Sequence, residues 1–359
     1  MEAELQLKAN KTGYSLRLEA LRGLAALLVV GHHAYLGPVY PWVRIFFNGS
    51  GAVSLFFVLS GYVLGLSLRR GAGPISRQYF VFICRRVLRI YPAYFVTTLA
   101  YFFYWKVYPF SEAASQLGGY AKLRLTSLGQ IESFLFLDNN LNLVTWSLKV
   151  EMVGSMMLPI LHFTSRKWHW SLRFVVLLLL LLLAFLPIGF AVTQRRLFMF
   201  YLGYLVIDLE SLPKLACRSY TIMAGLCMGA FFAAAFLRDY FPGFQPRLFL
   251  EAISAAGLIF CIQAGGISLG GALDHSWSRF AGRVSYSVFL VHLLILDVVV
   301  NLFMQSPLRT ASEHGLGLLV SLPLVMLVAW SVYRCVEKPF MDISKAFFSN
   351  RLNRKVAAA

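Results

Sequence analysis

The feature that most constrains this chain is a series of long apolar segments separated by short basic stretches. The clearest segment, 174–190, contains an unbroken run of nine leucines and valines. About 20 apolar residues cross a bilayer as a helix, and only helices or closed barrels satisfy their backbone there. Hydropathy therefore predicts about ten transmembrane helices. Their expected bounds are 22–41, 51–68, 90–108, 146–163, 172–192, 196–210, 219–237, 248–265, 284–304 and 315–334.

The composition excludes an ordinary soluble domain, because 58% of the residues are hydrophobic and only 14% are charged. The net charge of +17 is typical of nucleic-acid-binding proteins, but here the Lys and Arg residues lie in short clusters between apolar runs. No linker or repeat marks a second domain. The sequence therefore predicts an all-α, polytopic integral membrane protein of one domain, 1–359, with no nucleic-acid partner.

The basic residues also predict the orientation of the chain. With ten spans both termini lie on one side, and that side carries 23 of the 33 Lys and Arg residues, against 9 on the other. Cytoplasmic loops carry the excess of Lys and Arg in membrane proteins. We therefore expect both termini, including a tail over 342–359, to lie in the cytoplasm, with the protein in the plasma (inner) membrane.

Arg22 and His33 bracket the first apolar run with ten residues between them. Eleven helical steps of about 100° bring both side chains to one face, about 16 Å apart along the axis. This places Arg22 at the membrane surface and His33 deep in the hydrocarbon. Ionisable side chains at that depth are costly and usually functional, and imidazole exchanges protons near neutral pH. The pair is therefore a candidate catalytic core.

A second basic cluster, Arg85, Arg86 and Arg89, precedes the third span. Arg86 and Arg89 share a helix face, with Arg85 beside them. Guanidinium groups bind phosphates through bidentate contacts, so the cluster suits a polyanion such as the pyrophosphate of a coenzyme. The alternative is a basic anchor that only sets membrane orientation.

Three further features lie within the predicted spans. Glu151 lies five residues after Trp146 at the outer start of the fourth span, either in a salt bridge or orienting a base or an acceptor hydroxyl. His292, in the ninth span, is either a second site histidine or an interhelical hydrogen-bonding group. In the second span, Ser60 and Tyr62 flank Gly61; their hydroxyls line a polar tunnel or the segment simply packs closely. His32 is expected to contact a neighbouring helix.

Several of these motifs occur together in an order that resembles the membrane acyltransferase 3 family over about residues 15–341. The motifs are Arg22-x10-His33, Ser54-Leu55-Phe56-Phe57-Val58-Leu59-Ser60-Gly61-Tyr62, Arg86-x-x-Arg89-Ile90-Tyr91-Pro92, Trp146-Ser147-Leu148-x-x-Glu151, Gly282-Arg283-Val284-Ser285-Tyr286-Ser287 with His292, and Val336-Glu337-Lys338-Pro339-Phe340.

The resemblance implies a ten-span fold and transfer of an acyl group, usually acetyl, from cytoplasmic acyl-coenzyme A to a carbohydrate hydroxyl. It implies that Arg22 and His33 are the catalytic pair and that Arg86 and Arg89 contact the coenzyme. Met152 stands where a second carboxylate is common in the family.

The predicted assignments are as follows. We expect His33, Arg22, Glu151 and His292 to be catalytic; Arg85, Arg86 and Arg89 to bind acetyl-CoA as acyl donor; Ser60, Tyr62, Trp146 and Tyr286 to contact the acceptor; and no residue to bind a metal.

Two other functions fit parts of the pattern. A proton-coupled transporter or flippase of a lipid-linked sugar also carries intramembrane His, Glu and Arg, although no inverted repeat is visible. An O-acyltransferase of a small secondary metabolite, such as a macrolide sugar, requires only cytoplasmic access. For the enzyme we expect a glycan acceptor, membrane lipid and polysaccharide-assembly proteins as partners.

Overall fold

A computed structural model describes residues 16–34, 41–107, 127–136, 141–186, 191–241, 246–303 and 311–356 of the chain. All the regular elements of these residues are helices, which confirms the predicted all-α class. The elements are α2 Leu16–His33, α3 Pro41–Phe46, α4 Gly49–Arg69, α5 Ile75–Val107, α7 Ser127–Phe134, η2 Leu143–Thr145, α8 Trp146–Ser165, α9 Trp170–Phe185, α10 Ala191–Gln194, α11 Leu197–Leu209, α12 Cys217–Tyr240, α13 Arg247–Ala264, α14 Ser276–Phe303, α15 Ala311–Val332, η3 Tyr333–Glu337 and α16 Lys338–Val356.

Six stretches of the described chain are helical, long and apolar enough to cross a membrane. They are Trp42–Arg69, Leu143–Ser165, Cys217–Tyr240, Arg247–Ala264, Ser276–Val299 and Leu319–Phe348, and the apolar helices α9 and α11 are shorter. The helices α2 and α5 occupy the first and third predicted spans but begin with charged turns. The chain is therefore a helical membrane protein, and the count of ten spans stays a prediction.

Side-chain exposure is inverted relative to a soluble protein. Large apolar side chains point outward, including Leu182, Leu226 and Leu327, which are 62%, 70% and 60% exposed. Charged or polar groups such as Glu251 and His292 are fully buried. This arrangement suits a protein surrounded by lipid. Exposed leucines are compatible with hydrocarbon chains, whereas polar groups must be buried where other protein groups can pair with them.

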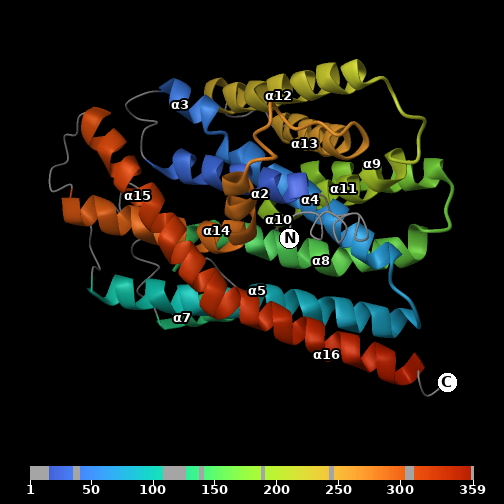
Figure 1. Cartoon of the computed structure of the whole chain (residues 1–359), viewed down its shortest axis with the longest axis horizontal. Helices are drawn as coiled ribbons and strands as arrows, with labels where there is room; N and C mark the ends of the chain where they lie inside the picture. Colours follow the sequence, from blue (N-terminus) through green and yellow to red (C-terminus); the bar gives the residue numbers. More distant parts are fainter. Residues whose placement is uncertain are drawn as a thin grey trace. The chain divides into compact units, whose positions relative to one another are not determined.

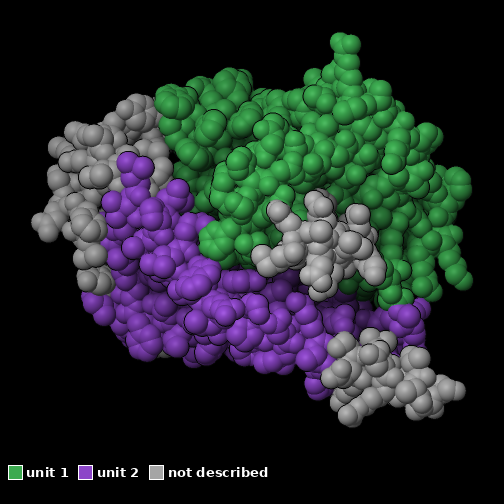
Figure 2. All heavy atoms as spheres, viewed as in Figure 1, with its two compact units in different colours: residues 1–71, 150–285 green, residues 72–149, 286–359 purple. Residues whose placement is uncertain are grey.

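The described residues form two compact units, shown in different colours in Figure 2. The first contains residues 1–71 and 150–285, and the second contains residues 72–149 and 286–359. Of the three boundaries, one lies between α4 and α5 and the other two fall inside α8 and α14, so each of these last two helices contributes one part to each unit.

In the first unit, α4 packs against α2, α11 and α13, while α12 lies alongside α13 (Figure 1). The side chain of Asn48 starts α4 by accepting a hydrogen bond from the Gly51 amide at 3.0 Å. This contact satisfies one of the amides that a helix start leaves unpaired. The amide nitrogen of the same side chain donates to the carbonyl of Phe231 in α12 at 2.7 Å, so one buried residue both caps α4 and ties it to α12.

Glycines set the contact between α4 and α11. A Cβ added at Gly61 would lie 1.9 Å from the carbonyl oxygen of Phe200, and one at Gly203 would lie 1.9 Å from that of Val58. The two backbones therefore approach each other more closely than any side chain permits. This confirms close packing around Gly61.

The second unit is built on α5, which packs against α7, η3 and α16. Ser287 of α14 donates a hydrogen bond to the buried carboxylate of Glu337 at 2.9 Å. Glu337 ends a π-helical turn, η3, that joins α15 to α16 without a break.

Some helix bounds differ from those that hydropathy predicts. The first helix ends at His33 rather than at 41, α5 begins 15 residues before the apolar run at 90, and the predicted tail is helical to Val356. Basic residues such as Arg are good helix formers, and Lys338 pairs with Asp342 one turn later at 2.8 Å. The helices α5 and α16 therefore extend beyond the apolar segments, because hydropathy identifies only the residues suited to the membrane interior.

Candidate functional site

Arg22 and His33 lie on one helix, α2, as the sequence predicts, with His33 as its last residue. Both side chains are half-buried, and both belong to the first unit. The eleven-residue separation corresponds to about 16 Å along the axis. The spacing of this candidate pair is thus a property of a regular helix.

The hydrogen bond of His33 determines which ring nitrogen is basic. Its Nδ1 lies 3.0 Å from the carbonyl oxygen of Val29, one turn earlier. A carbonyl only accepts hydrogen bonds, so the proton of the neutral ring resides on Nδ1 and the lone pair on Nε2. An imidazole in this tautomer is equipped to take a proton or to attack a carbonyl carbon through Nε2.

His32 fastens the end of α2 to the start of α4. Its Nδ1 lies 3.0 Å from the carbonyl oxygen of Phe47, and its ring is 5.2 Å from that of His33, edge to face. A Cβ at Gly49, the first residue of α4, would lie 2.6 Å from the His32 ring. The expectation that His32 contacts a neighbouring segment is confirmed, and the contact restricts the position of His33.

Of the two hydroxyl residues predicted on α4, Tyr62 is fully buried and Ser60 is half-buried. The Tyr62 hydroxyl donates to the carboxylate of Glu210 and accepts from the Gln263 amide at 3.0 Å. Tyr62 therefore links α4 to α13 and to the end of α11. Whether either residue contacts an acceptor stays a prediction.

The fourth predicted span begins where expected, because α8 starts at Trp146. Glu151 lies in its second turn, half-buried, in the first unit, and Trp146 lies in the second. The catalytic role of Glu151 and the acceptor role of Trp146 stay predictions.

The three arginines of the predicted coenzyme site lie on α5 in the second unit. Arg86 and Arg89 are half-buried and three residues apart, so they share a face of the helix. Arg85 is exposed, with its guanidinium 5.7 Å from the centre of the Phe348 ring. Two of the three groups are thus aligned, while Arg85 stacks on α16.

Tyr286 and His292 lie on the part of α14 that belongs to the second unit. The Tyr286 hydroxyl donates to the carbonyl of Ile90 at 2.7 Å, next to Arg89 in the sequence of α5. His292 is fully buried, and its Nδ1 lies 2.8 Å from the carbonyl oxygen of Phe289 in its own helix. Tyr286 therefore braces α5 against α14; the roles in acceptor binding and catalysis remain predictions.

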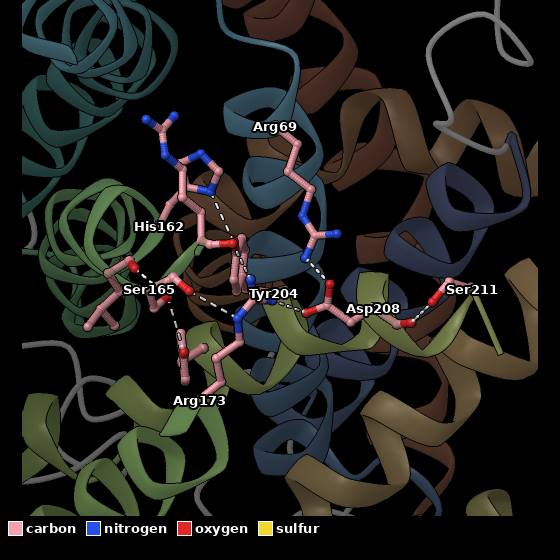
Figure 3. Close-up of polar contacts among 10 residues, drawn as sticks. Arg69, His162, Ser165, Arg173, Tyr204, Asp208 and Ser211 are labelled. Atoms are coloured by element: carbon pink, nitrogen blue, oxygen red, sulfur yellow. Dashed lines mark hydrogen bonds and ion pairs between the residues drawn. The ribbon is translucent and has the colours of Figure 1, made fainter. Parts of the chain in front are cut away.

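One polar cluster in the first unit was not anticipated (Figure 3). Asp208 of α11 accepts hydrogen bonds from Arg69 at 2.7 Å and from Arg173 at 2.8 Å, on different oxygens. Nearby, His162 and the Tyr204 hydroxyl are 3.0 Å apart, and the Arg69 guanidinium lies 4.9 Å from the centre of the Tyr204 ring. The cluster fastens α4 and α9 to α11 through one carboxylate. A lone aspartate at the end of an apolar run was the available signal.

A second unanticipated group is Glu251 on α13, fully buried with the Ser54 hydroxyl 2.6 Å away. A carboxylate inside an apolar predicted span was again the signal for it. Among the described residues, no three His, Cys, Asp or Glu side chains are grouped closely enough to hold a metal ion.

Comparison with known proteins identifies one family. The family model described as an acyltransferase domain, acyltransferase family 3, matches residues 15–334, which includes Arg22, His33, the arginines of α5 and His292. No curated protein and no solved structure matches the chain.

Proposed function

The chain belongs to the membrane acyltransferase 3 family, and on that premise we propose that it transfers an acetyl group from acetyl-CoA to a carbohydrate hydroxyl on a surface or exported polysaccharide. The observation that carries the proposal is the state of His33. Its Nδ1 faces the Val29 carbonyl at 3.0 Å, which makes Nε2 the basic nitrogen, on the same helix as Arg22.

The chemistry uses the lone pair of Nε2 in one of two ways. As a general base, Nε2 takes the hydroxyl proton while the hydroxyl oxygen attacks the thioester carbon; the carbon–sulfur bond breaks and the thiolate of coenzyme A leaves, later taking up that proton. As a nucleophile, Nε2 attacks the thioester carbon, the carbon–sulfur bond breaks and the thiolate of coenzyme A leaves. In the second step the hydroxyl oxygen attacks the acetyl carbon, the bond from Nε2 to that carbon breaks, and the hydroxyl proton passes to the thiolate. Both routes use the same lone pair.

Arg86 and Arg89, with Arg85 beside them, are proposed to bind the phosphates of acetyl-CoA. The charge pattern supports a plasma-membrane location with both termini in the cytoplasm, the side on which acyl-CoA is found. Glu151 and His292 are proposed to assist catalysis, and Ser60, Tyr62, Trp146 and Tyr286 to contact the acceptor.

Replacing His33 tests the proposal directly. We expect His33→Ala to lower acetyl transfer by about 10²–10⁴-fold, the usual contribution of a positioned acid–base group, while its level in the membrane is unchanged. The measurement is the acetyl content of the surface polysaccharide by mass spectrometry, together with release of coenzyme A by the purified protein. His162→Gln is the control, because His162 is a buried histidine whose contact is with Tyr204.

Normal acetylation by His33→Ala would refute the proposed role. Acid quenching of the wild-type protein with labelled acetyl-CoA separates the two routes, since only the nucleophilic one leaves label on the protein. A proton-coupled carrier would neither release coenzyme A nor become labelled. Label on a small metabolite instead of on polysaccharide would favour the small-molecule acyltransferase.

A further inference from the structure

The turn that joins α8 to α9 presents basic and aromatic side chains outward. It directly follows the candidate span Leu143–Ser165, and the apolar helix α9 begins at Trp170. Arg166 and Lys167 are exposed, and the side chains of Trp168 and Trp170 are 42% and 47% exposed. These four residues, here called the α8–α9 patch, therefore form an exposed surface where a membrane-spanning helix ends.

Hydrogen bonds hold the backbone of this turn in one conformation. The Arg173 guanidinium donates to the carbonyl oxygens of Ser165 at 3.0 Å and of Arg166 at 2.7 Å. The same guanidinium donates to the Asp208 carboxylate at 2.8 Å (Figure 3). The amide of Trp168 donates to the Ser165 carbonyl at 2.9 Å. The side chains of the α8–α9 patch therefore project from a backbone that α11 holds in place.

The two positive charges of the patch are not neutralised by the protein. The carboxylate of Asp208 is already bound by two other arginines. Neither Arg166 nor Lys167 has an ion pair among the described residues, and the Arg166 guanidinium lies 5.9 Å from the centre of the Phe163 ring. Guanidinium and ammonium groups bind phosphate oxygens through charge-assisted hydrogen bonds. Both charges are therefore available to an anion at the membrane surface.

The combination of tryptophan and basic residues indicates which anion fits. Tryptophan is enriched at the depth of lipid headgroups, where its ring contacts apolar groups and its N–H contacts polar ones. Leu178, Leu179 and Leu182 of α9 are also exposed, so an apolar surface for acyl chains follows the patch along the same helix. Free phosphate would contact only the basic residues, and an acidic protein would not reach the leucines within the membrane. A phospholipid with an anionic headgroup matches all three features.

We propose that the α8–α9 patch binds the headgroup of an anionic phospholipid, with Arg166 and Lys167 on the phosphate and the two tryptophans beside it. This inference does not depend on the proposed acetyl transfer. It assigns a lipid site to a surface that contains none of the residues proposed for the reaction.

The test measures lipid contact at the patch itself. The full-length protein is reconstituted into vesicles of dioleoylphosphatidylcholine that contain a minor fraction of brominated phosphatidylglycerol or brominated phosphatidylcholine, whose bromine atoms quench nearby tryptophan fluorescence. Each protein is measured with and without the pair Trp168→Phe and Trp170→Phe, and the difference is the emission of these two tryptophans. The quenching by each lipid gives the affinity of the patch for phosphatidylglycerol relative to phosphatidylcholine.

We expect the patch to prefer phosphatidylglycerol by about tenfold or more, because each basic residue near an anionic membrane surface contributes about fivefold in affinity. The double variant Arg166→Gln, Lys167→Gln should lose this preference while its tryptophans stay in place. The double variant Lys214→Gln, Arg218→Gln is the matched control, because it removes two exposed basic residues of the same unit on the same predicted side. It should keep the preference of the wild type.

Equal quenching of the wild type by the two lipids overturns the proposal and leaves the patch as a surface for an acidic protein. An equal loss of preference in both double variants also overturns it, since the overall charge then decides lipid contact. Inorganic phosphate should not displace the lipid; if it does, free phosphate is the ligand. Melting temperatures in vesicles of phosphatidylcholine alone should match in all the proteins, which shows that the variants are folded. The result is independent of whether the protein transfers acetyl groups.

Discussion

The two buried glutamates of the described residues differ in how completely their carboxylate oxygens are hydrogen-bonded. Glu337 and Glu251 both accept serine hydroxyls inside the helices. Only Glu251 has an oxygen that is shielded and without a donor. A buried carboxylate oxygen without a donor costs about 1–3 kcal/mol or more, so the burial of Glu251 is the costlier of the two.

At the scale of single residues, the proposed binding of acetyl-CoA by Arg86 and Arg89 can be tested. A charge-assisted hydrogen bond to phosphate contributes about 1.5–3 kcal/mol. The double variant Arg86→Ala, Arg89→Ala should therefore bind acetyl-CoA about 100-fold or more weakly, as measured by calorimetry on the purified protein. Arg77→Ala, on the same helix, is the control. An unchanged affinity in the double variant would remove both residues from the donor site.

At the scale of elements, the contact of α4 with α11 depends on glycine. Because a Cβ at Gly61 would lie 1.9 Å from the Phe200 carbonyl oxygen, Gly61→Ala must push the helices apart. We expect it to lower the free energy of unfolding by about 1–3 kcal/mol, the usual cost of overpacking. The measurement is thermal unfolding in detergent, followed by circular dichroism.

Gly225 on α12 provides the control for this prediction, since nothing lies within 4 Å of a Cβ added there. Alanine is favoured over glycine in a helix by about 1 kcal/mol, so Gly225→Ala should keep or raise the melting temperature. If the two substitutions changed the melting temperature equally, the prediction would be wrong, because α4 and α11 could then move apart without a loss of stability.

The contacts at the end of α2 help to determine the position of His33. The hydrogen bond from His32 to the Phe47 carbonyl fixes the last turn of the helix, and His33 is the final residue of that turn. The restraint limits the rotation of α2 and hence the direction of the His33 ring.

At the scale of the whole molecule, the charge distribution predicts the orientation in the membrane. A green fluorescent protein fused after Ala359 should fluoresce, because it folds in the cytoplasm, and alkaline phosphatase fused there should be inactive. Alkaline phosphatase inserted within 109–145, which the orientation places outside, should be active. The opposite pattern would contradict the predicted orientation. It would also place the proposed acetyl-CoA site on the outer side of the membrane.

Much of this molecule was accessible from its sequence because the relevant signals are local. Apolar runs indicated the helices, the start of α8 at Trp146 followed from the hydropathy boundary, and the eleven-residue spacing placed Arg22 and His33 on one helix. The order of motifs indicated the family that the match over residues 15–334 shows. These properties depend on hydropathy and helical periodicity, which neighbouring residues determine.

The partners of the polar side chains were decided only by the tertiary structure. Ser54 meets Glu251 across 197 residues of sequence, Tyr62 meets Gln263 across 201, and Arg69 meets Asp208 across 139. Each pairing depends on which helices become neighbours and how each one is rotated, and glycines such as Gly61 and Gly203 set that geometry through close backbone contact. Periodicity specifies the face on which a side chain lies, whereas packing of distant helices selects what that face meets.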